Sequence, residues 1–197
     1  MFNLTPVVRN LIIINVVIYL GQLMVPALTY YLALFDKNSG FFQPYQFFTY
    51  MFAHSPSSFF HVMFNMLALA SFAPILENYW GEKKFLFFYL ACGIGAGVIY
   101  FAVNYLFFPN TAGSMLGASG ALYGILMAFG LVFPNMEIML LFPPIPLKAK
   151  YMVFVMGLIT YVMDRSGTVA HLAHFGGAFV AFLLISLWRY QGQNRKW

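Results

Sequence analysis

Two polar side chains that can act together in nucleophilic chemistry stand near the start of strongly apolar segments. Ser119 lies in Gly-Ala-Ser-Gly (117–120), and His174 lies in Ala-His-Phe-Gly-Gly (173–177). A hydroxyl and an imidazole are costly to keep at membrane depth, which makes each of them a candidate functional residue. Because a serine becomes a nucleophile when a histidine takes its proton, the pair predicts covalent catalysis by a Ser119–His174 dyad.

His61 and Asn65 open a third apolar segment, and their spacing places both side chains on one face of a helix. Imidazole and amide N–H groups can stabilise an oxyanion, and the backbone N–H of Ser119, at a helix start, would add another donor. The alternative is that His61 and Asn65 only join neighbouring helices by hydrogen bonds. Tyr123 follows Ser119 by one turn, where we expect its ring to pack on His174, as an ordinary interhelical aromatic residue would also do.

Small residues would let the two helices that carry the dyad approach each other closely. Gly120 and Gly124 form a GxxxG motif directly after the serine, and Gly177 forms a small-xxx-small pair with Ala181 after the histidine. Such pairs allow backbone contact between membrane helices. GxxxG alone is common in membrane helices, so the motif indicates a site only in combination with the serine and the histidine.

The sequence predicts neither a carboxylate triad nor a metal site. None of the five acidic residues falls where it would complete a triad with the dyad, and no His-Glu-x-x-His motif is present. We therefore expect no metal and no cofactor, and a haem-binding protein or small transporter stays as an alternative. For His171 we expect a polar position near the outer water interface. The histidines are His54, His61, His171 and His174, and the acidic residues are Asp36, Glu77, Glu82, Glu137 and Asp164.

The composition predicts a membrane protein. Of the 197 residues, 62% are hydrophobic and 8% are charged, whereas soluble domains carry about 25% charged residues. So few charges cannot cover a water-facing surface, and the chain is expected to lie in a lipid bilayer. The net charge of +5 does not indicate a nucleic-acid partner, because no basic patch is interleaved with aromatic residues.

Six apolar segments are long enough, or nearly so, to cross a hydrocarbon core of about 30 Å, which takes about 20 helical residues. No polar stretch between them is long enough to fold alone. We therefore expect residues 1–197 to form a single all-α domain, a polytopic membrane bundle of six transmembrane helices. The predicted spans are residues 8–28, 59–79, 85–107, 117–133, 150–163 and 169–190.

The basic residues predict that both termini are cytoplasmic. With the N-terminus inside, eight of the ten Lys and Arg residues fall in cytoplasmic loops or ends, as the positive-inside rule requires. The second, fourth and sixth spans then all enter from the outer side, so His61, Ser119 and His174 share one membrane depth in a site open to outside water. The inside residues are Arg9, Lys83, Lys84, Lys148, Lys150, Arg189, Arg195 and Lys196, and the outside residues are Lys37 and Arg165.

The long first outer loop, residues 29–58, is rich in aromatic rings and holds one basic and one acidic residue, Lys37 and Asp36. Aromatic side chains favour the membrane interface, so we expect this loop to lie partly in the outer interface of the bilayer. A compact loop packed on the bundle would account for the same rings.

Taken together, these motifs resemble those of the rhomboid family of intramembrane serine proteases, over essentially the whole chain. Gly-Ala-Ser-Gly matches the family's nucleophile motif and Ala-His-x-x-Gly its histidine motif, which implies Ser119 as nucleophile and His174 as base. His171 does not fit, because the third residue after it is a histidine instead of a glycine. The His-x-x-x-Asn pattern at His61 and Asn65 implies an oxyanion role.

The resemblance also implies that Tyr123 stacks on the catalytic histidine. The implied form is the minimal six-helix bacterial type, in the bacterial inner membrane with its active site open to the periplasmic side. Two positions depart from the family's pattern: Tyr45-Gln46 stands where a Trp-Arg pair is frequent, and Ala181 stands where the last helix is expected to have a second glycine.

The activity that the resemblance implies is hydrolysis of a peptide bond in or near the transmembrane segment of a membrane-anchored substrate. The expected partners are single-span transmembrane proteins and the lipid bilayer, and the oligomeric state stays open. The alternative is a catalytically inactive rhomboid-like protein that binds membrane clients, although such proteins usually lack the serine or the histidine.

Overall fold

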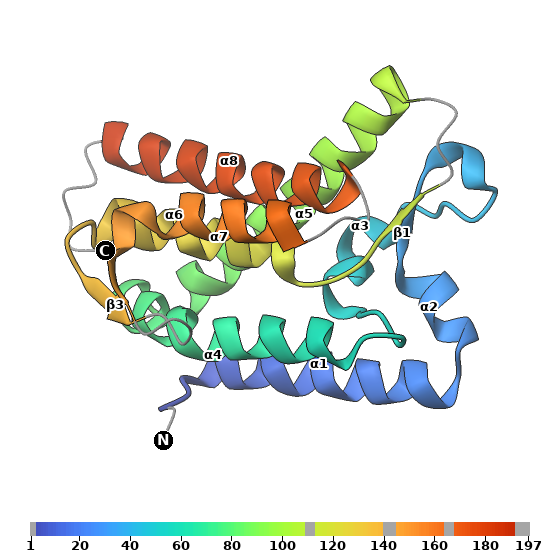
Figure 1. The fold of residues 1–197 in the computed structure, drawn as a ribbon, viewed down its shortest axis with the longest axis horizontal. Helices are drawn as coiled ribbons and strands as arrows, with labels where there is room; N and C mark the ends of the chain where they lie inside the picture. The colour runs from blue at the N-terminus through green and yellow to red at the C-terminus, as the bar shows by residue number, and fades with distance from the viewer. Residues whose placement is uncertain (1–2, 109–112, 140–144, 164–167, 192–197) are drawn as a thin grey trace.

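The structure is a computed structural model that describes residues 3–108, 113–139, 145–163 and 168–191. Helices make up most of it (Figure 1). The six longer helices are α1 (Pro6–Met24), α4 (Phe59–Trp80), α5 (Glu82–Phe107), α6 (Ser119–Val132), α7 (Ala149–Met163) and α8 (Thr168–Tyr190). The short elements are α2 (Ala27–Leu32), β1 (Leu34–Phe35), the 3-10 helix η1 (Lys37–Ser39), α3 (Gln46–Thr49), the 3-10 helix η2 (Tyr50–Phe52), β2 (Ser114–Met115), β3 (Glu137–Met139) and β4 (Pro146–Lys148).

Four of the described helices, α1, α4, α5 and α8, are long and apolar enough to cross a membrane, while α6 and α7 are shorter apolar helices. These six helices fall on the six predicted segments. The first of them ends at Met24 instead of near residue 28. Pro26 has no backbone N–H to continue the helix, and the chain starts the separate short helix α2 there.

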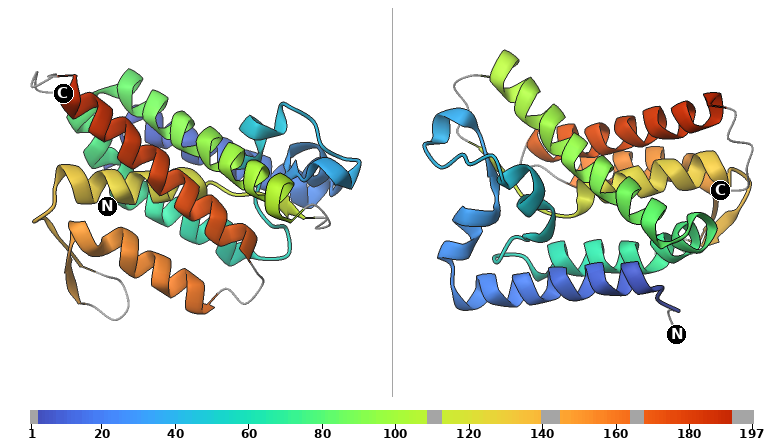
Figure 2. Two further views of the ribbon diagram at one scale, coloured as in Figure 1. Left: turned by 90° about the horizontal axis from the view of Figure 1, so that it is seen from above. Right: turned by 180° about the vertical axis from the view of Figure 1, so that it is seen from behind.

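Helix α6 is the central element of the bundle (Figures 1 and 2). It packs against α4, α5, α7 and, most extensively, α8. Most of its residues are buried, from Gly120 to Phe129. A helix that is apolar on all sides is stable only when it is covered on all sides, which explains why this short helix lies inside the bundle.

Helices α6 and α8 meet at their glycines, as the small-residue pattern predicts. A methyl group on Gly177 would overlap the backbone carbonyl of Gly120, and one on Gly124 would lie 2.6 Å from the Cβ atom of Cys92 on α5. Ala181 is fully buried, so the alanine at the departure from the family's pattern fits the close packing. The absence of side chains brings the two backbones into contact.

The described basic residues lie mainly at one end of the bundle. Helix α1 begins and α8 ends there, and the turn between α4 and α5 and the strands β3 and β4 lie at the same end (Figure 1). The carboxylate of Glu77, near the end of α4, accepts hydrogen bonds from the backbone N–H groups of Val7 and Val8 and so caps α1 at this end. Four residues used in the charge and triad arguments lie outside the described part of the chain: Asp164, Arg165, Arg195 and Lys196.

The region 29–58 is folded and packs on the opposite end of the bundle. Strand β1 pairs antiparallel with β2, and this joins the region to the segment just before α6. The fully buried amide of Gln46 binds several backbone groups: it accepts from the N–H groups of Phe35 and Gln43 and donates to the carbonyl of Phe41. Gln46 thus stabilises the region at the position where the family frequently has arginine.

Candidate active site

Ser119 is the first residue of α6, and the segment before it has a constrained backbone. Gly117 has a φ of +118°, which residues with a side chain rarely adopt. Its N–H donates to the carbonyl of Tyr50, and this hydrogen bond ties the segment to η2. Because the first N–H groups of a helix have no partner within it, the backbone of Ser119 presents a donor beside its own hydroxyl.

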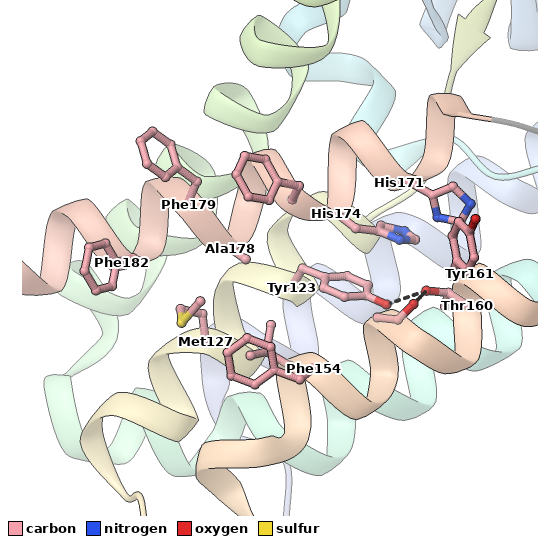
Figure 3. A pocket seen from close by; sticks show the side chains of 13 residues that line it. Tyr123, Met127, Phe154, Thr160, Tyr161, His171, His174, Ala178, Phe179 and Phe182 are labelled. Carbon is pink, nitrogen blue, oxygen red and sulfur yellow. Dashed lines mark hydrogen bonds between the residues drawn. The ribbon is translucent and has the colours of Figure 1, made fainter.

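His174 lies in the second turn of α8, and its ring is stacked on the ring of Tyr123. The ring centroids are 4.1 Å apart and the planes differ by 12° (Figure 3). The phenol of Tyr123 is hydrogen-bonded to the hydroxyl of Thr160 on α7 at 2.8 Å. The imidazole is therefore supported on one face by a ring that is itself held at its far end.

The close contact between α6 and α8 brings the chain neighbours of Ser119 and His174 together. Gly120, which follows the serine, lies against the carbonyl of Ala173, which precedes the histidine. Ser119 and Tyr123 are one turn apart on α6, so the face that carries the serine also carries the ring against which His174 rests.

His61 lies beside the segment that leads into the serine. Its Nε2 atom is 2.8 Å from the place that a methyl group on Gly117 would take, and the backbone nitrogen of Ser119 is 3.9 Å from that place. The Nδ1 atom of His61 accepts a hydrogen bond from the N–H of Ser55 at 3.3 Å. A neutral imidazole that accepts at Nδ1 carries its proton on Nε2, so His61 presents a donor on the side of the serine.

Asn65 is nearly buried and follows His61 by one turn. Its Nδ2 group donates one hydrogen bond to the carbonyl of His61 at 2.7 Å. An amide nitrogen carries two hydrogens, so the second remains for an acceptor placed between α4 and α6. The structure thus places both predicted oxyanion residues on α4, the helix that packs beside α6.

His54 and His171 occupy different surroundings. His54 is fully buried, with its ring 5.1 Å from that of His61, and its backbone is held by the side chain of Gln22. Burial, together with the nearby imidazole of His61, lowers the pKa of His54 to about 3, so its side chain is neutral at physiological pH. His171 instead packs on the ring of Tyr161 from α7.

A cavity of about 390 Å³ lies between α6, α7 and α8, next to the stacked rings (Figure 3). Tyr123, His174, Thr160 and His171 line one part of it, and apolar side chains such as Phe154 line the rest. Within the described residues, no group of three or more His, Cys, Asp or Glu side chains is placed to hold a metal ion.

Three supporting residues were not predicted from the sequence: Gln22, Gln46 and Thr160. The first two carry amides in or beside apolar segments, and the high cost of a polar group there is a signal that could have identified them. Thr160 gives no such signal, because a threonine in a membrane helix usually bonds to a carbonyl of its own helix.

The family's Rhomboid domain matches residues 42–191 of this chain. Among curated proteins, the mitochondrial Rhomboid protein 1 of Saccharomyces cerevisiae is 34% identical over 139 residues, which cover 66% of this chain and 38% of that protein. The mitochondrial presenilin-associated rhomboid-like protein of Bos taurus is 32% identical over 144 residues, which cover 66% of this chain and 34% of that protein. The human protein of that name is 32% identical over 136 residues, which cover 61% of this chain and 32% of that protein.

The chain therefore spans about a third of the length of these relatives. All three are named as mitochondrial, so the comparison does not support the bacterial inner membrane that the sequence suggested. The matched region contains the starts of α4, α6 and α8 with His61, Asn65, Ser119, Tyr123 and His174. With its apolar helices and this match over most of its length, the chain is an integral membrane protein that belongs to the rhomboid family.

Proposed function

We propose that this protein is an intramembrane serine protease that hydrolyses peptide bonds in or near the transmembrane segments of membrane-anchored proteins. The observation that carries the proposal is the stacking of Tyr123 on His174 at 4.1 Å, on the face of α6 that Ser119 opens. Membership of the rhomboid family, whose members are generally intramembrane serine proteases, supports the same activity.

In the proposed reaction, the hydroxyl oxygen of Ser119 attacks the scissile carbonyl while a ring nitrogen of His174 takes the hydroxyl proton. The resulting oxyanion accepts hydrogen bonds from the Ser119 N–H, the Nε2–H of His61 and the amide of Asn65. His174 then protonates the leaving amine, and the acyl-enzyme is resolved by water, from which His174 takes a proton. No carboxylate takes part, so the catalytic unit is a dyad.

The substrates are single-span membrane proteins whose helix weakens near the active site. A membrane helix hides its carbonyls in its own hydrogen bonds, so it must unwind locally before the serine can reach one. The site belongs to a bundle of six membrane helices with both termini cytoplasmic, and it opens to the outer side of the membrane. The gathering of described basic residues at the opposite end supports this orientation.

The test is cleavage of a single-span substrate with a helix-weakening segment, in liposomes, by the wild type and by the Ser119→Ala and His174→Ala variants. We expect cleavage by the wild type alone, with all three proteins equally stable to heat in detergent. A fluorophosphonate probe is expected to label the wild type and to leave Ser119→Ala unlabelled. Cleavage that survives Ser119→Ala would refute the dyad.

The inactive client-binding protein is the second candidate. The wild type would then bind single-span proteins without cleaving them and would not react with the probe. Both dyad residues are present here, and this favours the protease.

A further inference from the structure

Thr160 joins α7 to the ring that supports His174. Its hydroxyl lies 2.8 Å from the phenol oxygen of Tyr123, and this phenol belongs to the ring stacked on the imidazole (Figure 3). The chain of contacts thus runs from α7 through α6 to α8 within three side chains. Thr160 touches neither of the two residues of the dyad in this chain of contacts, so any effect on them passes through Tyr123.

The hydrogen bonds around Thr160 have a defined direction. Its hydroxyl is also 3.0 Å from the carbonyl oxygens of Met156 and Gly157 on its own helix. A hydroxyl has a single proton, and a carbonyl oxygen can only accept. The Thr160 proton therefore goes to its own helix, and Tyr123 donates its phenol proton to the Thr160 oxygen. The Thr160 oxygen is a well-positioned acceptor for Tyr123, because the hydrogen bond to its own helix fixes the orientation of the Thr160 hydroxyl.

The tyrosine needs this restraint because there is space beside it. The cavity of about 390 Å³ is lined by Tyr123, Thr160 and His174 together, so the ring is not enclosed on that side. Tyr123 itself is only 7% exposed, and a phenol that loses its acceptor there would leave a buried polar group unsatisfied or would turn toward the cavity.

Helix α7, which supplies the acceptor, lies at the edge of the bundle (Figure 2). It packs on α6 and, less extensively, on α8, and many of its apolar side chains are exposed, among them Phe154, Leu158 and Val162. The Tyr123–Thr160 hydrogen bond is thus a polar link between a peripheral helix and the centre of the site.

We propose that Thr160 is a positioning residue: its hydroxyl holds the Tyr123 ring on His174, so that the orientation of the general base depends on the position of α7. This inference rests on the proposed protease function. A general base must be aligned with its nucleophile to within a fraction of an ångström, and a displacement of about 1 Å can lower a rate about a hundredfold.

The test is a double-mutant cycle between Thr160→Val and Tyr123→Phe, measured as kcat and KM for the single-span substrate. Valine keeps the shape of threonine and removes only the hydroxyl. Each single variant is expected to lower kcat about tenfold with little change in KM, and the double variant no more than either single one. Thr160→Ser is expected to restore the wild-type rate, because it restores the acceptor.

Ser71→Ala is the matched control. Ser71 on α4 also bonds to a carbonyl of its own helix, that of Leu67, at 2.7 Å, and it has no role in the site. The Ser71→Ala variant shows how much activity changes when a hydroxyl that is bonded to its own helix is removed away from the site. Wild-type kcat in Thr160→Val, or losses that add in the double variant, would refute the coupling. A wild type that neither cleaves nor reacts with the fluorophosphonate would instead refute the proposed function.

A second readout tests the coupling without activity. The chain has four histidines, so in protein labelled with ¹³C-histidine the ring signals of His174 are assigned by their loss in His174→Ala. Stacking on an aromatic ring moves these proton signals upfield. We expect Thr160→Val and Tyr123→Phe to change the His174 signals while Ser71→Ala leaves them unchanged, and an unchanged spectrum in Thr160→Val would refute the inference whether or not the protein is active.

Discussion

At the scale of single residues, the site depends on which atoms of His61 can donate. The N–H of Ser55 occupies its Nδ1 atom, so the proton lies on Nε2, near the segment that leads into Ser119. We predict that His61→Ala lowers kcat about a hundredfold, as the loss of one oxyanion donor does in a serine hydrolase. The measurement is the steady-state rate of substrate cleavage, with heat stability in detergent as the check on folding.

His171→Ala is the matched control for this prediction. It removes another imidazole from the same end of the molecule, but His171 packs on Tyr161 and not beside the serine. Its kcat is expected to stay within about twofold of the wild type. If both variants lost activity equally, the loss would reflect a general need for imidazole at this end of the bundle and not an oxyanion donor.

The residues of the candidate site could be named from the sequence, whereas the residues that support them could not. A serine, a histidine and an asparagine in apolar segments stand out because each is costly there. The stacking partner Tyr123 is also found, because it follows the serine by one turn. Thr160 and Gln22 act through contacts between segments far apart in the chain, with Tyr123 and with the backbone of His54, and no spacing in the sequence predicts which segments meet.

At the scale of elements, the glycine at the crossing of α6 and α8 sets how close the serine and the histidine can be. A methyl group on Gly177 would overlap the carbonyl of Gly120, which is backbone and cannot turn away. We predict that Gly177→Ala moves α8 off α6, lowers stability by about 3 kcal/mol and abolishes cleavage. The measurements are the midpoint of thermal unfolding in detergent and the rate of substrate cleavage.

Gly157→Ala is the comparison for the stability change. Gly157 lies inside α7, and a methyl group there would meet no atom within 4 Å. Because alanine favours a helix over glycine by about 1 kcal/mol, this variant should unfold at the same or a slightly higher temperature. A Gly177→Ala protein as stable and active as the wild type would mean that the two helices have room to separate.

The existence and the order of the long helices can be predicted from hydropathy alone. The residues at which they end, and the helices against which they pack, cannot. The first predicted span overran α1 because apolar residues continue past Pro26, where the backbone can no longer continue the helix. The region 29–58 could be read as an interfacial loop or a packed one. The structure has it packed: Gln46 holds the region together from within, and the β1–β2 pair and the hydrogen bond from the phenol of Tyr50 to the carbonyl of Gly93 join it to the bundle. Its place in the bilayer interface stays a prediction.

At the scale of the whole molecule, the shared direction of three helices brings the separate motifs to one end. Helices α4, α6 and α8 all begin at the same end of the bundle, so the polar residues near their starts lie at that end although they are far apart in the sequence (Figure 1). The described basic residues lie mainly at the other end. One end thus carries the candidate chemistry and the other the charges that orient a membrane protein during insertion.

This arrangement predicts which side of the membrane each end faces. The chain has one cysteine, Cys92, and it is fully buried, so the wild type should not react with a membrane-impermeant maleimide. Asn38, at the end that carries the site, and Asn135, at the opposite end, are both exposed. In intact bacterial spheroplasts that express the protein, we expect Asn38→Cys to be labelled at once and Asn135→Cys only after the membrane is permeabilised. The reverse pattern would place the serine and the histidine on the cytoplasmic side, because both variants share one fold and differ only in which end carries the thiol.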